Sequence, residues 1–122
     1  MMKSHIDVST VLRQTVSQSY TNLVTRPTGA AVRTYIEQQI RCVDNCTVAV
    51  IDFSHVAMMD FSCADEIVAK LVLQGDERCP TLVFSGLSES HIEAIDAVLE
   101  RHGLALVSHE ADSSTYIAAV MH

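Results

Sequence analysis

Three features are missing from this sequence, and each absence argues against a class of function. No stretch approaches the roughly 20 apolar residues that span a bilayer, and the N-terminus lacks the apolar core of a signal peptide. No glycine-rich loop is present to hold a phosphate, so nucleotide hydrolysis has no support. Lys and Arg are outnumbered by Asp and Glu, 8 against 15, and the net charge of −7 disfavours nucleic acid and membrane surfaces as partners. We therefore expect a cytoplasmic protein.

Proline and glycine are also scarce, with two prolines and four glycines in 122 residues. No repeat, low-complexity tract or linker interrupts the chain. A chain of this length, 48% apolar, buries enough surface to form a core without a metal or a disulfide. We therefore expect a single domain spanning residues 1–122.

The cysteines form no complete metal-binding pattern. Cys42 and Cys46 are spaced C-x-x-x-C, but Cys63 and Cys79 stand alone, and no second close pair completes a zinc site. In a reducing cytoplasm they are expected to remain thiols and to pack as small hydrophobes. We predict neither a metal nor a cofactor.

Strand patterns and helix patterns alternate along the chain. The predicted strands are 47–53, 81–84, 104–107 and 116–120. Two helices are predicted at about 27–41 and about 62–74. A third helix is predicted to begin at an S-x-x-E capping box formed by Ser90 and Glu93, and to end at Gly103. Gly75 is expected to end the second helix in a left-handed conformation. This order predicts an α/β fold with a mainly parallel sheet of four to five strands and about three helices.

Two segments allow alternatives. In residues 5–24, Ile6 and Val8 alternate with polar neighbours as in a strand, whereas one face of a helix would hold Val8, Leu12, Val16 and Tyr20. Ser, Thr and Gln disfavour the helix, so we expect a short strand followed by irregular or extended chain. Residues 116–120 form either a strand paired with 104–108 or a terminal helix, and their β-branched and aromatic side chains favour the strand.

The segment with the clearest functional signal runs from Val50 to Glu66. A buried strand ends at the corner Asp52-Phe53-Ser54, a short apolar loop follows, and Asp60 precedes a helix that opens with Ser62-Cys63-Ala64-Asp65-Glu66. This segment resembles the centre of a STAS domain, the fold of bacterial anti-sigma factor antagonists. It is most similar to a STAS-like family of unassigned function. Members of that family carry, upstream of this segment, an Arg, then a Gly or an Ala, and then a helix, and residues 25–33 of this chain resemble that pattern. The likeness covers about residues 22–107.

The resemblance implies a module for signal transduction and transcription regulation that works by binding another protein. The partner it implies is a histidine-kinase-like ATPase or an anti-sigma factor, and a homodimer is also possible. The binding surface would be the loop and helix start at 54–66. There Asp60 and Asp65 would contribute charge, and Met58 and Phe61 an apolar patch.

The sequence departs from the STAS pattern at the residue that is phosphorylated in the classical switch. Phe61, not Ser, follows Asp60. Ser62 stands one position later, where we expect it to cap the helix, with phosphorylation of Ser62 as the alternative. We expect Phe61 to pack into the core, with an exposed aromatic anchor as the alternative. One residue of the Met58-Met59 pair is expected in the core.

Two other functions compete with protein binding. STAS folds can also hold small molecules beside this helix, so ligand sensing is one alternative. The other is an enzyme that depends on Cys63, because the first turn of a helix lowers the pKa of a thiol and His55 is the nearest base in sequence. No recognised catalytic signature surrounds Cys63, so we do not expect an enzyme. The other histidines, at positions 5, 91, 102, 109 and 122, are expected on the surface.

Overall fold

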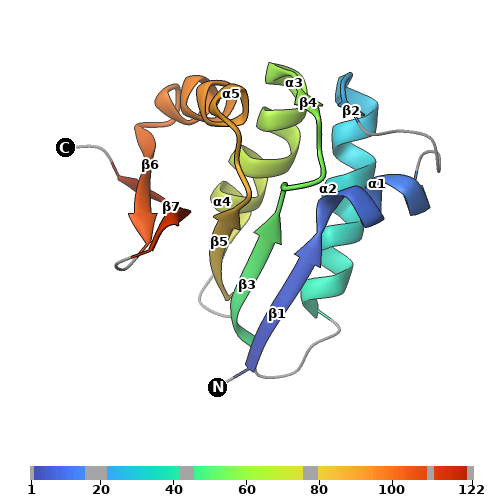
Figure 1. Cartoon of the computed structure of the whole chain (residues 1–122), viewed down its shortest axis with the longest axis horizontal. Helices are drawn as coiled ribbons and strands as arrows, with labels where there is room; N and C mark the ends of the chain where they lie inside the picture. The colour runs from blue at the N-terminus through green and yellow to red at the C-terminus, as the bar shows by residue number, and fades with distance from the viewer. Residues whose placement is uncertain (1, 16–21, 42–45, 76–79, 110–111, 121–122) are drawn as a thin grey trace.

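The computed structural model describes residues 2–15, 22–41, 46–75, 80–109 and 112–120 (Figure 1). Within them the elements are, in chain order, β1 (Met2–Asp7), α1 (Val8–Thr15), β2 (Asn22–Leu23), α2 (Arg26–Arg41), β3 (Cys46–Asp52), β4 (Met58–Met59), α3 (Phe61–Ala64), the π-helical turn η1 (Asp65–Ala69), α4 (Lys70–Gln74), β5 (Thr81–Ser85), α5 (Glu89–Glu100), β6 (Leu104–His109) and β7 (Asp112–Val120). Among these helices, none combines the length and the apolar surface that crossing a bilayer requires.

The main sheet has five strands in the order β1-β3-β5-β7-β6. The pairs β1–β3 and β3–β5 are parallel, whereas β7 is antiparallel to both β5 and β6. The predicted α/β class is therefore confirmed, but the sheet is mixed and not mainly parallel. The reason is that β6 and β7 form a hairpin, which confirms the predicted pairing of the last two strands, and the hairpin joins the sheet through β7.

The N-terminal segment contains a helix where irregular chain was predicted. After β1, the Asp7 carboxylate accepts hydrogen bonds from the Ser9 amide at 3.0 Å and the Ser9 hydroxyl at 2.7 Å, which starts α1. Val8, Val11 and Leu12 are buried on one face of that helix. Burial of this apolar face outweighs the weak helix propensity of its Ser, Thr and Gln residues. With α1, the described residues hold four helical segments, one more than predicted.

The core lies between the sheet and the helices. In Figure 1, α2 and α4 lie behind β1, β3 and β5. Ala49, Ile51 and Phe84 point from the strands into this core and are fully buried. The predicted helix at 27–41 is confirmed as α2, and its residues Val32 and Ile36, one turn apart, are fully buried.

The helix predicted at 62–74 is present but contains a π-helical turn. The turn η1 places Glu66, Ile67, Val68 and Ala69 in succession, and all four are buried. Four successive helical residues cover the whole circumference, so this segment is enclosed by neighbours on every side. Contacts with α2 and α5 supply part of that enclosure. π-Turns within helices are rare and are often found at functional sites.

Two predicted helix ends differ in the structure. Ser88, not Ser90, caps α5: its hydroxyl accepts the His91 amide at 3.2 Å, while the Ser88 amide donates to His91 Nδ1 at 3.1 Å. His91 thus takes the role that was predicted for Glu93. Gly103 follows the end of α5, as predicted, and is left-handed at φ 70°. Gly75 is not left-handed, because its φ is −62° and its ψ is 140°.

Candidate functional site

The candidate site lies where α2 and α3 begin, at the upper right in Figure 1. The short strands β2 and β4 pair in parallel and lead directly into these two helices. The Asp60 amide also donates to the Leu23 carbonyl at 2.9 Å. The two segments that carry the STAS resemblance, 25–33 and 62–66, are therefore in contact although more than 30 residues separate them in sequence.

Asp60 connects the starts of both helices. Its Oδ1 accepts the Cys63 amide at 2.8 Å and the Ser62 hydroxyl at 2.8 Å, and its Oδ2 accepts the Thr25 amide at 3.0 Å. Burial raises the pKa of this carboxyl, but the hydrogen bonds from Cys63 and Thr25 outweigh it and lower the pKa below its ordinary value. The predicted cap by Ser62 is wrong: Asp60 is the N-cap, and Ser62 donates to it.

Thr25 adopts a conformation that is unusual for its residue type. Its φ is +70°, in the left-handed region that a β-branched residue rarely occupies. Three hydrogen bonds hold it there: its amide donates to Asp60, and its carbonyl accepts the Gly29 amide at 3.2 Å and the Cys63 thiol at 3.1 Å. Strained residues that persist in this way are often found at functional sites.

Cys63 is a buried hydrogen-bond donor. Its side chain is fully buried, and its thiol contacts the Thr25 carbonyl. Burial and the nearby charge of Asp60 raise the pKa of this thiol to about 12. The prediction that the helix start lowers this pKa is wrong, because burial and the carboxylate that caps the helix both oppose the thiolate. The candidate nucleophile therefore stays protonated at neutral pH.

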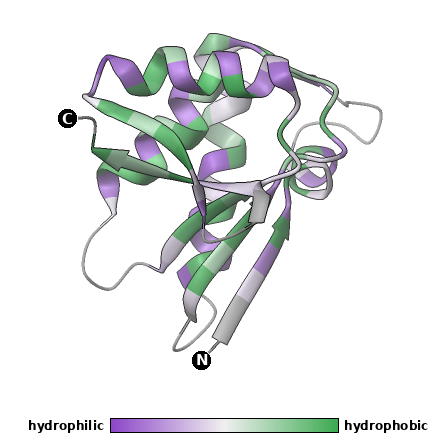
Figure 2. Cartoon of the chain, turned by 60° about the vertical axis from the view of Figure 1, so that its left-hand side comes forward, coloured by the Kyte–Doolittle hydropathy of each residue, from purple (hydrophilic) through white to green (hydrophobic). Residues whose placement is uncertain are grey.

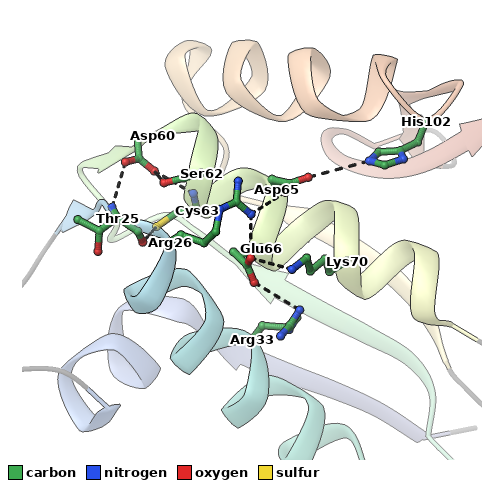
Figure 3. A network of polar contacts seen from close by, with 10 residues as sticks. All are labelled: Thr25, Arg26, Arg33, Asp60, Ser62, Cys63, Asp65, Glu66, Lys70 and His102. Atoms are coloured by element: carbon green, nitrogen blue, oxygen red, sulfur yellow. Dashed lines mark hydrogen bonds and ion pairs between the residues drawn. The ribbon is translucent and has the colours of Figure 1, made fainter.

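Glu66 is a buried carboxylate with three cationic neighbours (Figure 3). Its side chain is only 4% exposed, and its Oε1 lies 2.8 Å from Arg26 Nη1 and 2.7 Å from Lys70 Nζ. Its Oε2 lies 3.5 Å from Arg33 Nη1. Burial raises the pKa of Glu66, but the bonds from Lys70 and Arg26 outweigh it and lower the pKa. This cluster connects α2 to η1 and α4.

Asp65 belongs to the same cluster and is not a free charge. Its Oδ2 lies 2.8 Å from Arg26 Nη1, and its Oδ1 lies 4.0 Å from His102 Nε2. Arg26 thus bridges two carboxylates, and its own side chain is 52% exposed. The hydrogen bonds to Asp65 and Glu66 raise the pKa of Arg26. Of the predicted site charges, Asp60 and Asp65 are therefore both engaged within the chain.

Met58 and Phe61 are exposed at this edge. Met58 is 57% exposed and Phe61 is 54% exposed, while Met59 is buried. The prediction that one methionine belongs to the core is confirmed, whereas the preferred prediction for Phe61 is wrong. Phe61 opens the helix, and Cys63 and Ala64, two and three positions later, take the buried face. We call Met58 and Phe61, with the neighbouring Arg26 and Asp65, the junction surface.

Sequence reasoning did not select Arg26, Arg33, Glu66 and Lys70 as site residues. A signal for them exists: the two arginines are seven residues apart on α2, and Glu66 and Lys70 are four apart, so each pair shares a helix face. The spacing does not show that the two helix faces meet around the buried carboxylate of Glu66.

The remaining candidates for chemistry are scattered. Within the described ranges, no three His, Cys, Asp or Glu side chains lie close enough to hold a metal. His91 is buried at 1% exposure, so its predicted surface position is wrong. Cys42, Cys79 and His122 lie outside the described residues.

One half-open pocket bears on the alternative of ligand sensing. It lies between the C-terminal ends of α2 and α4, far along both helices from the junction surface, and Ile40, Leu71 and Leu82 line it. Its volume is about 110 Å³. That volume is below the range of about 300–1,000 Å³ that is typical of small-molecule pockets. A shallower hollow between β1, α1 and α2, lined by Asp7, Val11 and Tyr35 among others, reaches about 310 Å³ but lies open to solvent.

Protein-family models, curated proteins and solved structures were each compared with the chain, and none matches it. The functional proposal therefore rests on the geometry of the junction and on the residues that form it.

Proposed function

We propose that this chain is a STAS-like regulatory module that binds a protein partner through the junction surface. The partner class is a histidine-kinase-like ATPase or an anti-sigma factor, as for the anti-sigma factor antagonists that the sequence resembles. Binding, and not catalysis, is the proposed activity.

The observation that carries this proposal is the exposure of Met58 and Phe61. Both are more than half exposed, and both come from the connection between β3 and α3 that resembles the STAS centre. Exposed aromatic residues are common energetic centres of interfaces, and methionine suits adaptable contacts. Arg26 and Asp65, which pair at 2.8 Å at the starts of the same two helices, are the charged residues that we assign to the rim of this apolar centre.

The junction surface is held in place before any partner arrives. Asp60 fixes the starts of α2 and α3 relative to each other, and the Glu66 cluster fixes the two helices below. A preformed surface loses little conformational freedom on binding. This rigidity supports a role as a docking face.

Ser62 is the proposed site of a regulatory phosphate. Its hydroxyl lies 2.8 Å from Asp60 Oδ1. A phosphate there adds about −1.5 to −2 charges next to a carboxylate that caps the helix. Repulsion would displace the Asp60 hydrogen bonds and alter the neighbouring Phe61, so phosphorylation would release the partner.

The proposal is tested by affinity capture from the native cell, with mass spectrometry to identify the partner and any phosphorylated residue. Phe61→Ser is expected to weaken binding of the identified partner at least about tenfold, because it removes the aromatic contact. The matched control is Leu73→Ser. Leu73 is 50% exposed near the other end of the same helical run, so it presents a similar apolar side chain outside the junction surface.

The role of the junction surface would be contradicted if both variants lost binding equally, or if neither variant lost binding. A partner outside the two named classes would contradict the proposed identity of the module. Asp60→Lys is a poor test, because it also removes the cap of α3 and the bond to Thr25.

A further inference from the structure

The buried face of α5 contains one polar side chain. Of the five buried residues of this helix, which is described throughout, Ala94, Ile95, Val98 and Leu99 are apolar and His91 is not. In Figure 2, hydrophilic and hydrophobic residues alternate along α5 at the top of the molecule, as expected for a helix with one face on the core. A histidine that is only 1% exposed on the covered face is an exception to this pattern.

The ring of His91 packs against the loop that leads to the junction surface. Its centroid lies 6.1 Å from that of the Phe53 ring, at the start of this loop. The backbone carbonyls of Ala57 and Val56 also lie close to the ring. These two residues directly precede Met58, and β4 and α3 both contact α5. The ring therefore supports the segment that places Met58.

Hydrogen bonding fixes the position of the proton on this ring. Nδ1 of His91 accepts the Ser88 amide at 3.1 Å, so the proton of the neutral imidazole is on Nε2. Within the described residues, Nε2 forms no hydrogen bond. A second proton has to go to Nδ1, which then faces the Ser88 amide as one donor faces another. Protonation therefore breaks one of the two bonds of the capping box of α5.

The protonated ring would also be a buried charge without a counter-charge. Burial lowers the pKa of His91, and the carbonyls of Ala57 and Val56 oppose that shift only in part. The charged or titratable residues on the surrounding elements are His55 in the loop, Asp60, Asp65 and Glu66 at α3 and η1, Glu89, Glu93, Asp96 and Glu100 on α5, and His109 on β6. None of them contributes to the shift in the pKa of His91. A cation here is therefore expected to leave the buried site.

We infer that His91 couples pH to the position of Met58, and hence to partner binding at the junction surface. Protonation moves the ring out of its buried site, which releases the start of α5 and residues 56–57 and so displaces Met58. The effect on binding rests on the proposed function, because Met58 belongs to the surface that binds the partner. His91 is thus a positioning residue, and the junction surface binds best when its ring is neutral.

The coupling is tested without the partner by ¹H–¹⁵N NMR spectra of the labelled chain between about pH 7.5 and 5. The amides of Ser88, Ala57 and Met58 are expected to titrate with the same midpoint as the His91 ring, below about 6.5. His91→Gln should abolish this titration, whereas His55→Gln, which removes the exposed histidine of the same loop, should keep it. The inference is overturned if the ring stays neutral down to about pH 5, or if the amides of Ala57 and Met58 respond alike in the two variants.

Binding of the identified partner is then compared at about pH 7.5 and 5.5 by isothermal titration calorimetry. The wild type is expected to bind about two- to tenfold more weakly at the lower pH, because each unit by which binding lowers the pKa of His91 allows up to about tenfold in affinity. His91→Gln should lose this dependence, and His55→Gln should keep it. Equal pH dependence in the wild type and His91→Gln, including none in either, overturns the coupling alone. A wild type that binds no partner at about pH 7.5 contradicts the proposed function instead, and the NMR titration still decides the coupling.

Discussion

At the scale of single residues, Asp60 shows why a carboxylate serves this position better than a hydroxyl. A capping Ser offers one side-chain oxygen to one helix. Asp60 offers two oxygens and uses them on two helices, one on the Cys63 amide and the other on the Thr25 amide. Ser62 is left to support the carboxylate by donating to it. The residue that marks the STAS-like segment is therefore also the residue that joins its two halves.

Glu66 is the residue on which the cluster of ion pairs depends. Glu66→Gln is expected to lower the free energy of unfolding by about 3 kcal/mol, because it removes the buried anion that the partly buried Arg33 and its cationic neighbours share. Urea denaturation followed by circular dichroism measures this loss.

The control for this change is Glu37→Gln on α2. Glu37 pairs with Arg33 and Arg41 one turn away on α2, and its side chain is 25% exposed against 4% for Glu66. Such pairs contribute about 0–1 kcal/mol, so the control should lose little stability. Equal losses in the two variants would contradict the special role of the buried carboxylate.

At the scale of elements, the close approach of α2 and α3 depends on one small residue. A Cβ added to Gly29 would lie 2.9 Å from Glu66 Cβ and 3.1 Å from Cys63 Cα. No larger residue fits without separating the two helices. This contact, together with the cluster at Glu66, sets the position of the junction surface.

Gly29→Ala is expected to lower the free energy of unfolding by up to about 2 kcal/mol. Alanine improves helix propensity by about 1 kcal/mol, but forcing an extra carbon into a packed contact costs about 1–3 kcal/mol. The measurement is again urea denaturation.

Gly75→Ala is the comparison, and the opposite sign is expected for it. Gly75 has φ −62°, which alanine adopts freely, and the nearest atom to its added Cβ is the Val72 carbonyl oxygen at 3.4 Å. A gain of up to about 1 kcal/mol follows from the reduced freedom of the unfolded chain. If Gly29→Ala also stabilised the protein, that result would contradict the claim that the helices are too close at Gly29 to accept an extra carbon.

At the scale of the whole molecule, the junction surface lies apart from the C-terminal hairpin. Figure 1 places the starts of α2 and α3 at the upper right and the β6–β7 hairpin at the left. Changes at the junction surface are therefore not expected to disturb the pairing of β6 with β7.

The stability of the whole molecule should fall with acid in two steps. His91 is buried, and burial lowers its pKa from 6.5. The unfolded chain therefore binds a proton more readily, so the free energy of unfolding falls as the pH drops below about 6.5. Glu66 and Asp60 have lowered pKa values, so their stabilisation persists above about pH 4.5 and is lost at lower pH.

His91→Gln separates the two steps. Glutamine does not titrate, and it suits the capping-box position that His91 occupies in α5. The variant should lose the pH dependence between about pH 6.5 and 5 and keep the steeper fall below it. Chemical denaturation at a series of pH values measures both steps. An unchanged slope between pH 6.5 and 5 would contradict the assignment to His91.

The sequence by itself determined the local elements and the segment of interest. Periodic apolar residues predict α2 and α5, β-branched runs predict β3 and β5, and both signals depend only on near neighbours. The corner at Asp52 is equally local, because its Oδ1 accepts the Ser54 amide at 2.9 Å. The helix α1 was missed because burial by distant residues, and not propensity, stabilises it.

Only the tertiary structure decided which side chains meet. It placed β7 between β5 and β6, exposed Phe61, buried His91, and gathered Arg26, Arg33 and Lys70 around Glu66. The cap at Asp60 was not selected either, because its second partner lies 35 residues away at Thr25. Spacing along a chain reports which face of an element a residue occupies. Whether a charge can be buried there, or a ring exposed, depends on which residues of the rest of the fold pack against that face.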